Sequence, residues 1–116
     1  MDMYVIDPGQ FKFKIEILER VKTYDDAGSP IESWEEGLGF KVVKQTRACV
    51  RPVSAKDYFE AMSNQMQVTH KVIIRYTKGI NHTLFIKFRG RKLDIIRVVN
   101  IDEADKYLEI YATESI

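Results

Sequence analysis

The sequence has little of several residue types on which a function could rest. It contains one cysteine and two histidines, and its net charge is only +1, from 18 basic and 17 acidic residues. The single cysteine, Cys49, excludes an intramolecular disulfide and a cysteine-based structural zinc site. The near balance of charge argues against a dedicated nucleic-acid-binding protein, which usually carries a strong basic excess or patch.

Long apolar runs are also missing. No run approaches the roughly 20 residues that cross a bilayer. The first ten residues lack the basic and apolar regions of a signal peptide. We therefore expect a cytosolic protein with no membrane partner. The length of 116 residues fits one domain, 1–116, with a modest core that oligomerisation could supplement.

Alternation of apolar and polar residues is what the sequence does contain. Residues 11–21 alternate apolar and charged side chains, which predicts a strand with one buried face, and a turn at 25–30 joins it to a second strand at 31–34. Pro52 cannot donate a ladder hydrogen bond, so we expect the next strand to lie near a sheet edge. The pattern predicts a mainly β protein, a small antiparallel β-barrel of six to seven strands. The remaining strands are predicted at 48–53, 67–76, 84–88, 92–99 and 107–112.

Two segments depart from this alternation. Residues 54–66 have Ser54 as a possible N-cap, Asp57 in the first turn and an apolar stripe at helical spacing, which predicts one α-helix packed against the barrel. Residues 35–47 contain Gly37 and Gly39 and do not alternate cleanly. We expect a long, mobile loop there, with short strand ends.

The residues capable of chemistry do not form a constellation. His70 shares a predicted strand face with Val72 and Ile74, which favours a packed, structural histidine over a base or a metal ligand. His82 lies in a polar turn, without carboxylates or cysteine at ligand spacing. Cys49 lies in a strand, where a small core residue is the usual role. We therefore expect no cofactor, no metal and no enzyme, and rank a hydrolase using His70 or Cys49 last.

Basic residues cluster around one predicted hairpin turn. Either the turn is simply solvated, or it contacts phosphate or an acidic partner surface. If the turn contacts phosphate, one possible function is that of a small barrel that binds single-stranded nucleic acid, with Tyr76 or Phe85 stacking on the bases. We keep this as an alternative to the function that the resemblance below implies. Alternation assigns Phe88 to the core. The basic residues are Lys87, Arg89, Arg91 and Lys92.

Several segments, in order along nearly the whole chain, resemble the head–tail joining (head–tail adaptor or stopper) family of tailed phages and prophages. They are FKFKIEILERV, IESWEE, RPVSAKDYFEA, VTHKVIIRY, RGRKLDIIRVVNIDE and YLEIYA. The resemblance implies a non-enzymatic virion protein, held in the host cytoplasm before assembly. It implies one subunit of a ring in the head–tail connector, which completes the DNA-filled head, docks the tail and helps to close the DNA channel.

The resemblance also implies partners. These are further copies of the chain in a ring, for which dodecameric order is one option, the portal or adaptor ring, tail-completion proteins, and the double-stranded DNA that passes through the channel. The subunit can be monomeric in isolation. The segment at 35–47 is longer than the family pattern, so it is either a channel-lining or gating loop or an ordinary surface loop. Its candidate residues are Gly37, Leu38, Gly39, Phe40, Lys41, Lys44, Gln45 and Arg47.

Overall fold

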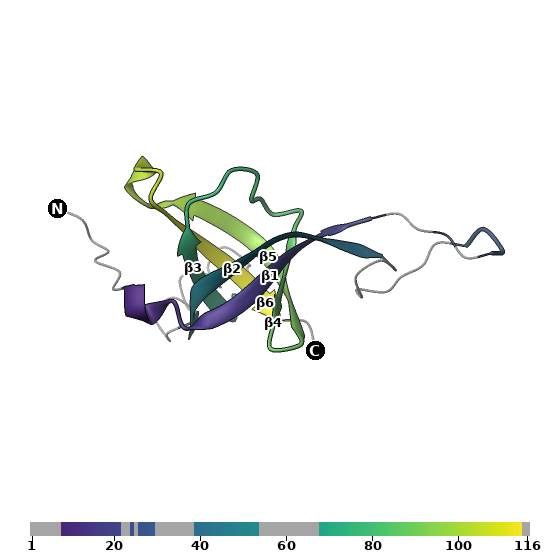
Figure 1. Ribbon diagram of the computed structural model, residues 1–116, viewed down its shortest axis with the longest axis horizontal. Coiled ribbons are helices and arrows are strands. Elements are labelled where there is room, and N and C mark those ends of the chain that lie inside the picture. The colour runs from purple at the N-terminus through teal and green to yellow at the C-terminus, as the bar shows by residue number, and fades with distance from the viewer. Residues whose placement is uncertain (1–7, 22–23, 25, 30–38, 54–67, 115–116) are drawn as a thin grey trace.

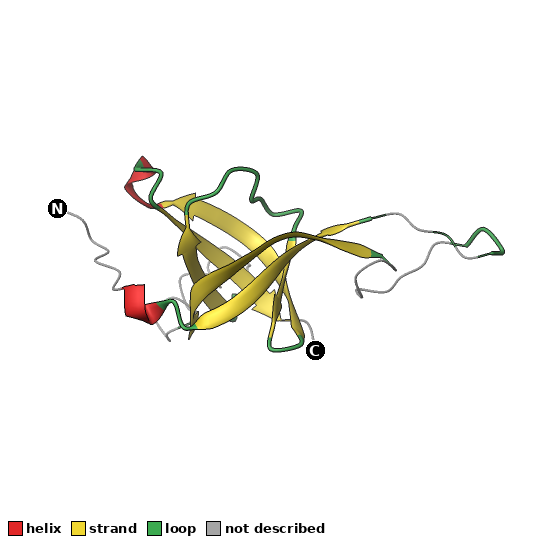
Figure 2. Cartoon of the chain, in the orientation of Figure 1, coloured by secondary structure: helices red, strands yellow, loops and turns green. Residues whose placement is uncertain are grey.

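The computed structural model describes residues 8–21, 24, 26–29, 39–53 and 68–114. Within these ranges, six strands join in a closed antiparallel barrel with the order β1-β2-β3-β6-β5-β4, and β4 pairs with β1 to close it (Figures 1 and 2). The prediction of a small, mainly β barrel is confirmed. The elements are η1 (Pro8–Gln10), β1 (Phe13–Arg20), β2 (Phe40–Pro52), β3 (His70–Arg75), β4 (Phe85–Phe88), β5 (Arg91–Asn100), η2 (Ile101–Glu103) and β6 (Tyr107–Glu114).

Two predicted elements lie outside the described residues: the α-helix at 54–66 and the strand at 31–34. The helical residues that are described form the two 3-10 turns η1 and η2. In the described part of the chain, no helix is both long and apolar enough to span a membrane.

The inside of the barrel is filled with apolar side chains from all six strands. Leu84, Ile86 and Phe88 belong to this core, as the alternation predicted. Burying one such side chain contributes roughly 1.5–3 kcal/mol. The core therefore accounts for much of the stability of the fold. Its buried members are Ile15, Ile17, Ala48, Val72, Ile74, Leu84, Ile86, Phe88, Leu93, Ile95, Leu108, Ile110 and Ala112.

The prediction of a long loop is wrong for residues 40–47. These residues form the first part of the 13-residue strand β2. The pairing with β1 covers the whole of β1, from Arg20 opposite Phe40 to Phe13 opposite Ala48. The β-branched residues at 42, 43 and 46 favour this extended backbone.

The predicted edge position near Pro52 holds only locally. In the closed barrel β2 lies between β1 and β3, but its pairing with β1 ends at Ala48, and Cys49–Pro52 pair with β3 alone. Pro52 is the last residue of β2, opposite His70 at the start of β3. The ladder toward β3 continues past it, since the Val53 amide donates to the Thr69 carbonyl at 3.2 Å. A proline is tolerated at position 52 because it lies beyond the pairing with β1, which ends at Ala48.

A β-bulge interrupts the β1–β2 pair. Ile17 pairs with Lys44 and Leu18 pairs with Val42, which leaves Val43 as an extra residue in β2. Val43 is 46% exposed, whereas Leu18 is only 2% exposed although it lies on the outer wall, opposite Phe85 of β4. The outer wall therefore has an apolar patch here, and β1 and β2 continue past it as a ribbon beyond the barrel (Figure 1).

A second apolar cluster covers the outer wall of β2, β3 and β6. Phe11 stacks on Tyr107 with ring centroids 5.9 Å apart, and Cys49, Ile73 and Ile101 pack in the same cluster. Cys49 is 5% exposed and carries a free thiol. It is a small core residue, as its position in a strand predicted.

Turns of different charge lie at the two ends of β5. Arg89 and Gly90 form a two-residue β4–β5 turn, with φ values of 50° and 75°. Positive φ at both positions is the signature of a type I′ hairpin, which glycine favours. At the other end of β5, the acidic η2 turn leads into β6, and the two turns lie on opposite sides of the barrel (Figure 1).

Candidate functional site

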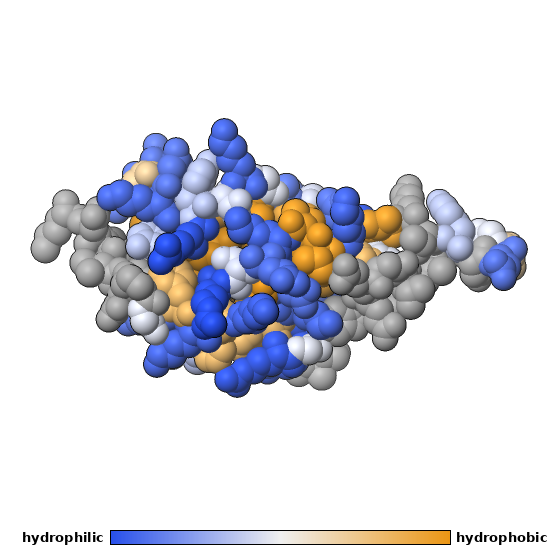
Figure 3. All heavy atoms as spheres, in the orientation of Figure 1, coloured by the Kyte–Doolittle hydropathy of each residue, from blue (hydrophilic) through white to orange (hydrophobic). Residues whose placement is uncertain are grey.

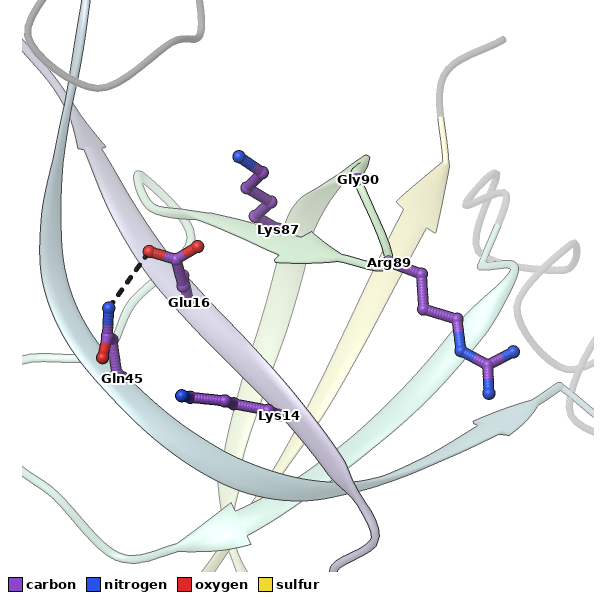
Figure 4. Close-up of a pocket in the computed structure, with 6 residues that line it drawn as sticks. All are labelled: Lys14, Glu16, Gln45, Lys87, Arg89 and Gly90. Carbon is purple, nitrogen blue, oxygen red and sulfur yellow. Dashed lines mark hydrogen bonds between the residues drawn. The ribbon is translucent and has the colours of Figure 1, made fainter.

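A shallow polar groove lies on the outer wall where β1 is flanked by β2 and β4. Glu16 of β1 is at its centre, and it faces Gln45 on one side and Lys87 on the other. Gln45 Nε2 donates a hydrogen bond of 3.4 Å to Glu16 Oε2. Figure 4 shows Lys14 and Lys87 on either side of Glu16. The groove is lined by Lys14, Glu16, Gln45, Lys87, Arg89 and Gly90.

Arg89 forms the rim of this groove. Its side chain points away from Glu16 (Figure 4), and its guanidinium lies 4.7 Å from the centroid of the Phe13 ring and 5.5 Å from that of Phe88. Such cation–π contacts at exposed sites are worth roughly 0.5–1 kcal/mol. They hold the charge at the hairpin end of the barrel.

The wall around the groove is basic although the whole chain is nearly neutral. Arg47 is the strand partner of Lys14 and is exposed beside it. Lys14, Arg47, Lys87 and Arg89 thus stand against the single carboxylate of Glu16. A local excess of positive charge attracts anionic groups over about a Debye length, which is roughly 8 Å at physiological salt. Polar side chains also cover most of the face in Figure 3, with apolar ones showing between them and toward the β1–β2 ribbon.

The groove brings together residues from two groups that the sequence suggested separately. Gln45, predicted in a mobile loop, lines the same groove as Lys87 and Arg89 from the basic turn. Lys14 and Glu16 were missed by sequence reasoning, because they read as the ordinary polar face of a strand. Their outward parity was visible in the sequence, but their partners depend on strand pairing.

Other residues of the predicted loop lie elsewhere. Lys44 points to the inner side of the ribbon, where its Nζ donates to Thr77 Oγ1 at 3.4 Å. Phe40 packs edge-on against Phe85, with ring centroids 5.1 Å apart. Lys41 faces Glu19 across the pair with β1. Gly39 accepts a hydrogen bond from a backbone amide, while Gly37 and Leu38 lie outside the described residues.

The other two basic residues of the turn have local partners. Arg91 Nη1 lies 3.4 Å from Glu114 Oε1 at the end of the barrel. Lys92 Nζ lies 3.8 Å from Asp94 Oδ1 and 4.4 Å from the centroid of the Phe85 ring. The four cations therefore lie around one turn, as the sequence suggested, but they do not form one patch.

His70 lies in the row of the inner residues Val72 and Ile74, with its ring 6.3 Å from that of Phe88. Its Nδ1 is 2.8 Å from Thr69 Oγ1. Burial lowers the pKa of His70, an effect partly opposed by the charge of Glu114 and reinforced by that of Arg91. A neutral, packed imidazole fits this position.

The residues of the hydrolase hypothesis lie on opposite sides of the barrel wall. His70 belongs to the inner row, whereas Cys49 packs in the outer cluster with Ile73. Among the described residues, no group of three or more His, Cys, Asp or Glu side chains could hold a metal ion. The surface groove is therefore the site best placed to interact with another molecule.

Comparisons with known proteins identify the family. The family model for the phage head completion protein matches residues 6–115. The chain is 25% identical over 96 residues to the head completion protein gp7 of Enterobacteria phage HK97, covering 78% of this chain and 80% of that protein.

Two solved structures share the fold. The solution structure of protein SF1141 from Shigella flexneri 2a has a TM-score of 0.71 and 28% identity, covering 95% of this chain and 97% of that one. A chain in the virion of a native gene transfer agent particle has a TM-score of 0.55 and 16% identity, covering 89% of this chain and 94% of that one. The sequence resemblance is thereby confirmed. The chain belongs to the phage head completion protein family, and it is a structural protein of the phage head, located in the virion.

Proposed function

We propose that this protein is a non-enzymatic subunit of a ring in the head–tail connector. The ring completes the DNA-filled head, docks the tail and helps to close the DNA channel. The observation that carries the proposal is the family match over residues 6–115. The filled barrel supports it, because core side chains such as Ile86 and Ile110 are 0% exposed and occupy the interior. Recognition by the described barrel therefore uses its outer walls.

The positions of Cys49 and His70 support a non-enzymatic role. A cysteine or histidine mechanism needs a nucleophile and a base within hydrogen-bond reach. The barrel wall lies between Cys49 and His70, and the cluster around Cys49 is apolar. Both residues serve as packing groups in this proposal.

The partners are further copies of the chain, the portal or adaptor ring, tail-completion proteins and the DNA in the channel. The β1–β2 ribbon is the element best suited to line or gate that channel, because it extends away from the barrel (Figure 1). Lys41 is exposed on it, and Arg47 is exposed on the adjoining barrel wall beside Lys14. A nearly neutral chain suits a conduit for DNA. Each phosphate that a basic side chain neutralises adds affinity through counterion release, so a strongly basic channel would retain the DNA.

Light scattering coupled to size exclusion tests the proposal. The protein is measured alone at several concentrations, and then mixed with the portal–adaptor complex from its own gene neighbourhood. Stable co-elution at a ring-like mass is the expected result. Failure to co-elute, together with salt-sensitive retention of single-stranded DNA, would favour the nucleic-acid module instead. The structure favours that alternative less, because the Phe85 ring already contacts Phe40 and Lys92.

A further inference from the structure

The acidic turn between β5 and β6 is a shaped, exposed feature. Asp102, Glu103 and Asp105 are exposed, and all have positive φ. Asn100 fixes the turn, because its Nδ2 donates to Asp105 Oδ1 at 2.7 Å and its Oδ1 accepts from the Asp105 amide at 3.2 Å. The next residue, Lys106, is exposed as well. The turn therefore presents three carboxylates followed by one cation in a defined conformation.

The basic groove lies at the other end of the same strand. β5 runs from Arg91, beside the hairpin turn, to Asn100, beside the acidic turn. At about 3.3 Å per residue this separates the two ends by roughly 30 Å. One chain cannot place its own acidic turn in its own groove. The two features can meet only between two copies.

We propose that the acidic turn Ile101–Lys106 of one copy docks into the Lys14–Glu16–Lys87 groove of the next copy. This inference rests on the proposed ring and names its subunit contact. The charge patterns match in both signs: carboxylates of the turn meet Lys14 and Lys87, and Lys106 meets Glu16. A DNA backbone matches less well, because its phosphates would be repelled by Glu16.

A contact of this kind is head-to-tail. The two copies use different surfaces, so a pair of copies still has one open groove and one open turn for further copies. Repeating the contact with a constant rotation gives a closed ring or a filament. Because the contact is made of exposed charges, each single interface is weak and screened by salt. This agrees with a subunit that can be monomeric alone and associates on a template.

Engineered cysteines at neutral positions test the contact while keeping its charges. Gln45→Cys lies in the groove and Ala104→Cys lies in the acidic turn, and both residues are exposed. Each is made with Cys49→Ala and treated with a short bismaleimide. The chain with both cysteines should give a ladder of oligomers, and a mixture of the two single-cysteine chains should give dimers only. Ala104→Cys combined with Lys78→Cys, in an exposed turn outside the groove, is the matched control.

Charge reversal separates a specific contact from accidental collision. Lys14→Glu with Lys87→Glu should reduce the Gln45–Ala104 product about tenfold, because the groove then repels the turn. Asp102→Lys with Glu103→Lys, in the same chain as those two changes, should restore it. Circular dichroism checks that every variant is folded. Equal ladders in all variants and in the Lys78 control would overturn the inference.

The same cross-linking is run on the free protein at high concentration and on its complex with the portal–adaptor ring. Co-elution at ring mass without a Gln45–Ala104 product above the control overturns this contact and leaves the proposed function standing. Neither co-elution nor a ladder would overturn both. Protection of the Gln45→Cys thiol by duplex DNA, without cross-linking between copies, would assign the groove to DNA and also overturn the inference.

Discussion

Replacing Leu18 with alanine tests whether the outer wall of β1 is part of the core. From alternation alone, Leu18 joins the polar face with Lys14 and Glu16, and its truncation should cost little. In the structure it is 2% exposed and faces Phe85 across the β1–β4 pair. Burial on this wall requires the closed barrel and the bulge at Val43, so the substitution tests both.

The expected cost follows from the atoms removed. Leu18→Ala deletes Cγ and both Cδ atoms, which at about 0.8 kcal/mol per buried carbon gives a transfer term of roughly 2.4 kcal/mol. The cavity left behind adds to this, so we expect a loss of about 2–4 kcal/mol in the free energy of unfolding. In a chain of this size, that loss lowers Tm by roughly 10 °C or more.

Urea unfolding followed by circular dichroism measures this loss. Ile17→Ala, at the neighbouring residue of the inner wall, is 0% exposed and should cost a similar amount. Val43→Ala is the matched control, because its side chain is 46% exposed and its loss should cost about 0.5 kcal/mol or less. A cost below about 1 kcal/mol for Leu18→Ala, with Ile17→Ala behaving as expected, would refute the buried outer wall.

Three further predictions concern charge and backbone. Burial lowers the pKa of His70 in the folded protein, so the unfolded chain protonates this imidazole more readily. The stability that neutral His70 contributes is therefore present above about pH 6.5 and is lost as the pH falls below that value. His70→Gln should therefore flatten the fall in urea midpoint between pH 7.5 and 5.5. Gly90→Ala should cost about 1 kcal/mol in thermal unfolding, because φ is 75° there, and Gly90→Asn should cost less. Lys71 Nζ lies 3.7 Å from Oε2 of the buried Glu109, so Lys71→Met should lower the free energy of unfolding by about 3 kcal/mol. Adding Glu109→Leu to Lys71→Met should recover most of this loss. Equal losses for the single and double variants would contradict an ion-pair role.

Local pattern determined much of the fold. Alternation assigned Ile15 and Ile17 to the inner face of β1, and Ile86 and Phe88 to the inner face of β4. Gly90 marked the hairpin turn, whose positive φ suits glycine. These features are readable from sequence because side-chain direction in a strand repeats every second residue and turn chemistry is local.

The candidate site was only partly within reach of the sequence. Gln45, Lys87 and Arg89 were already candidates, but as parts of a loop and a separate turn. That they line one groove around Glu16 depends on the register of β1 against both β2 and β4. Register depends on pairing between distant segments and on the bulge at Val43, neither of which has a local signal.

The sequence by itself determined the strand faces, the turns and the family. The tertiary structure alone decided that β1 closes the barrel against β4, that Leu18 is buried, and that Pro52 lies past the end of the β1 pairing. It also decided that the basic groove and the acidic turn lie at opposite ends of β5. The reason is physical: alternation fixes which way a side chain points, but only the pairing of strands fixes what it points at.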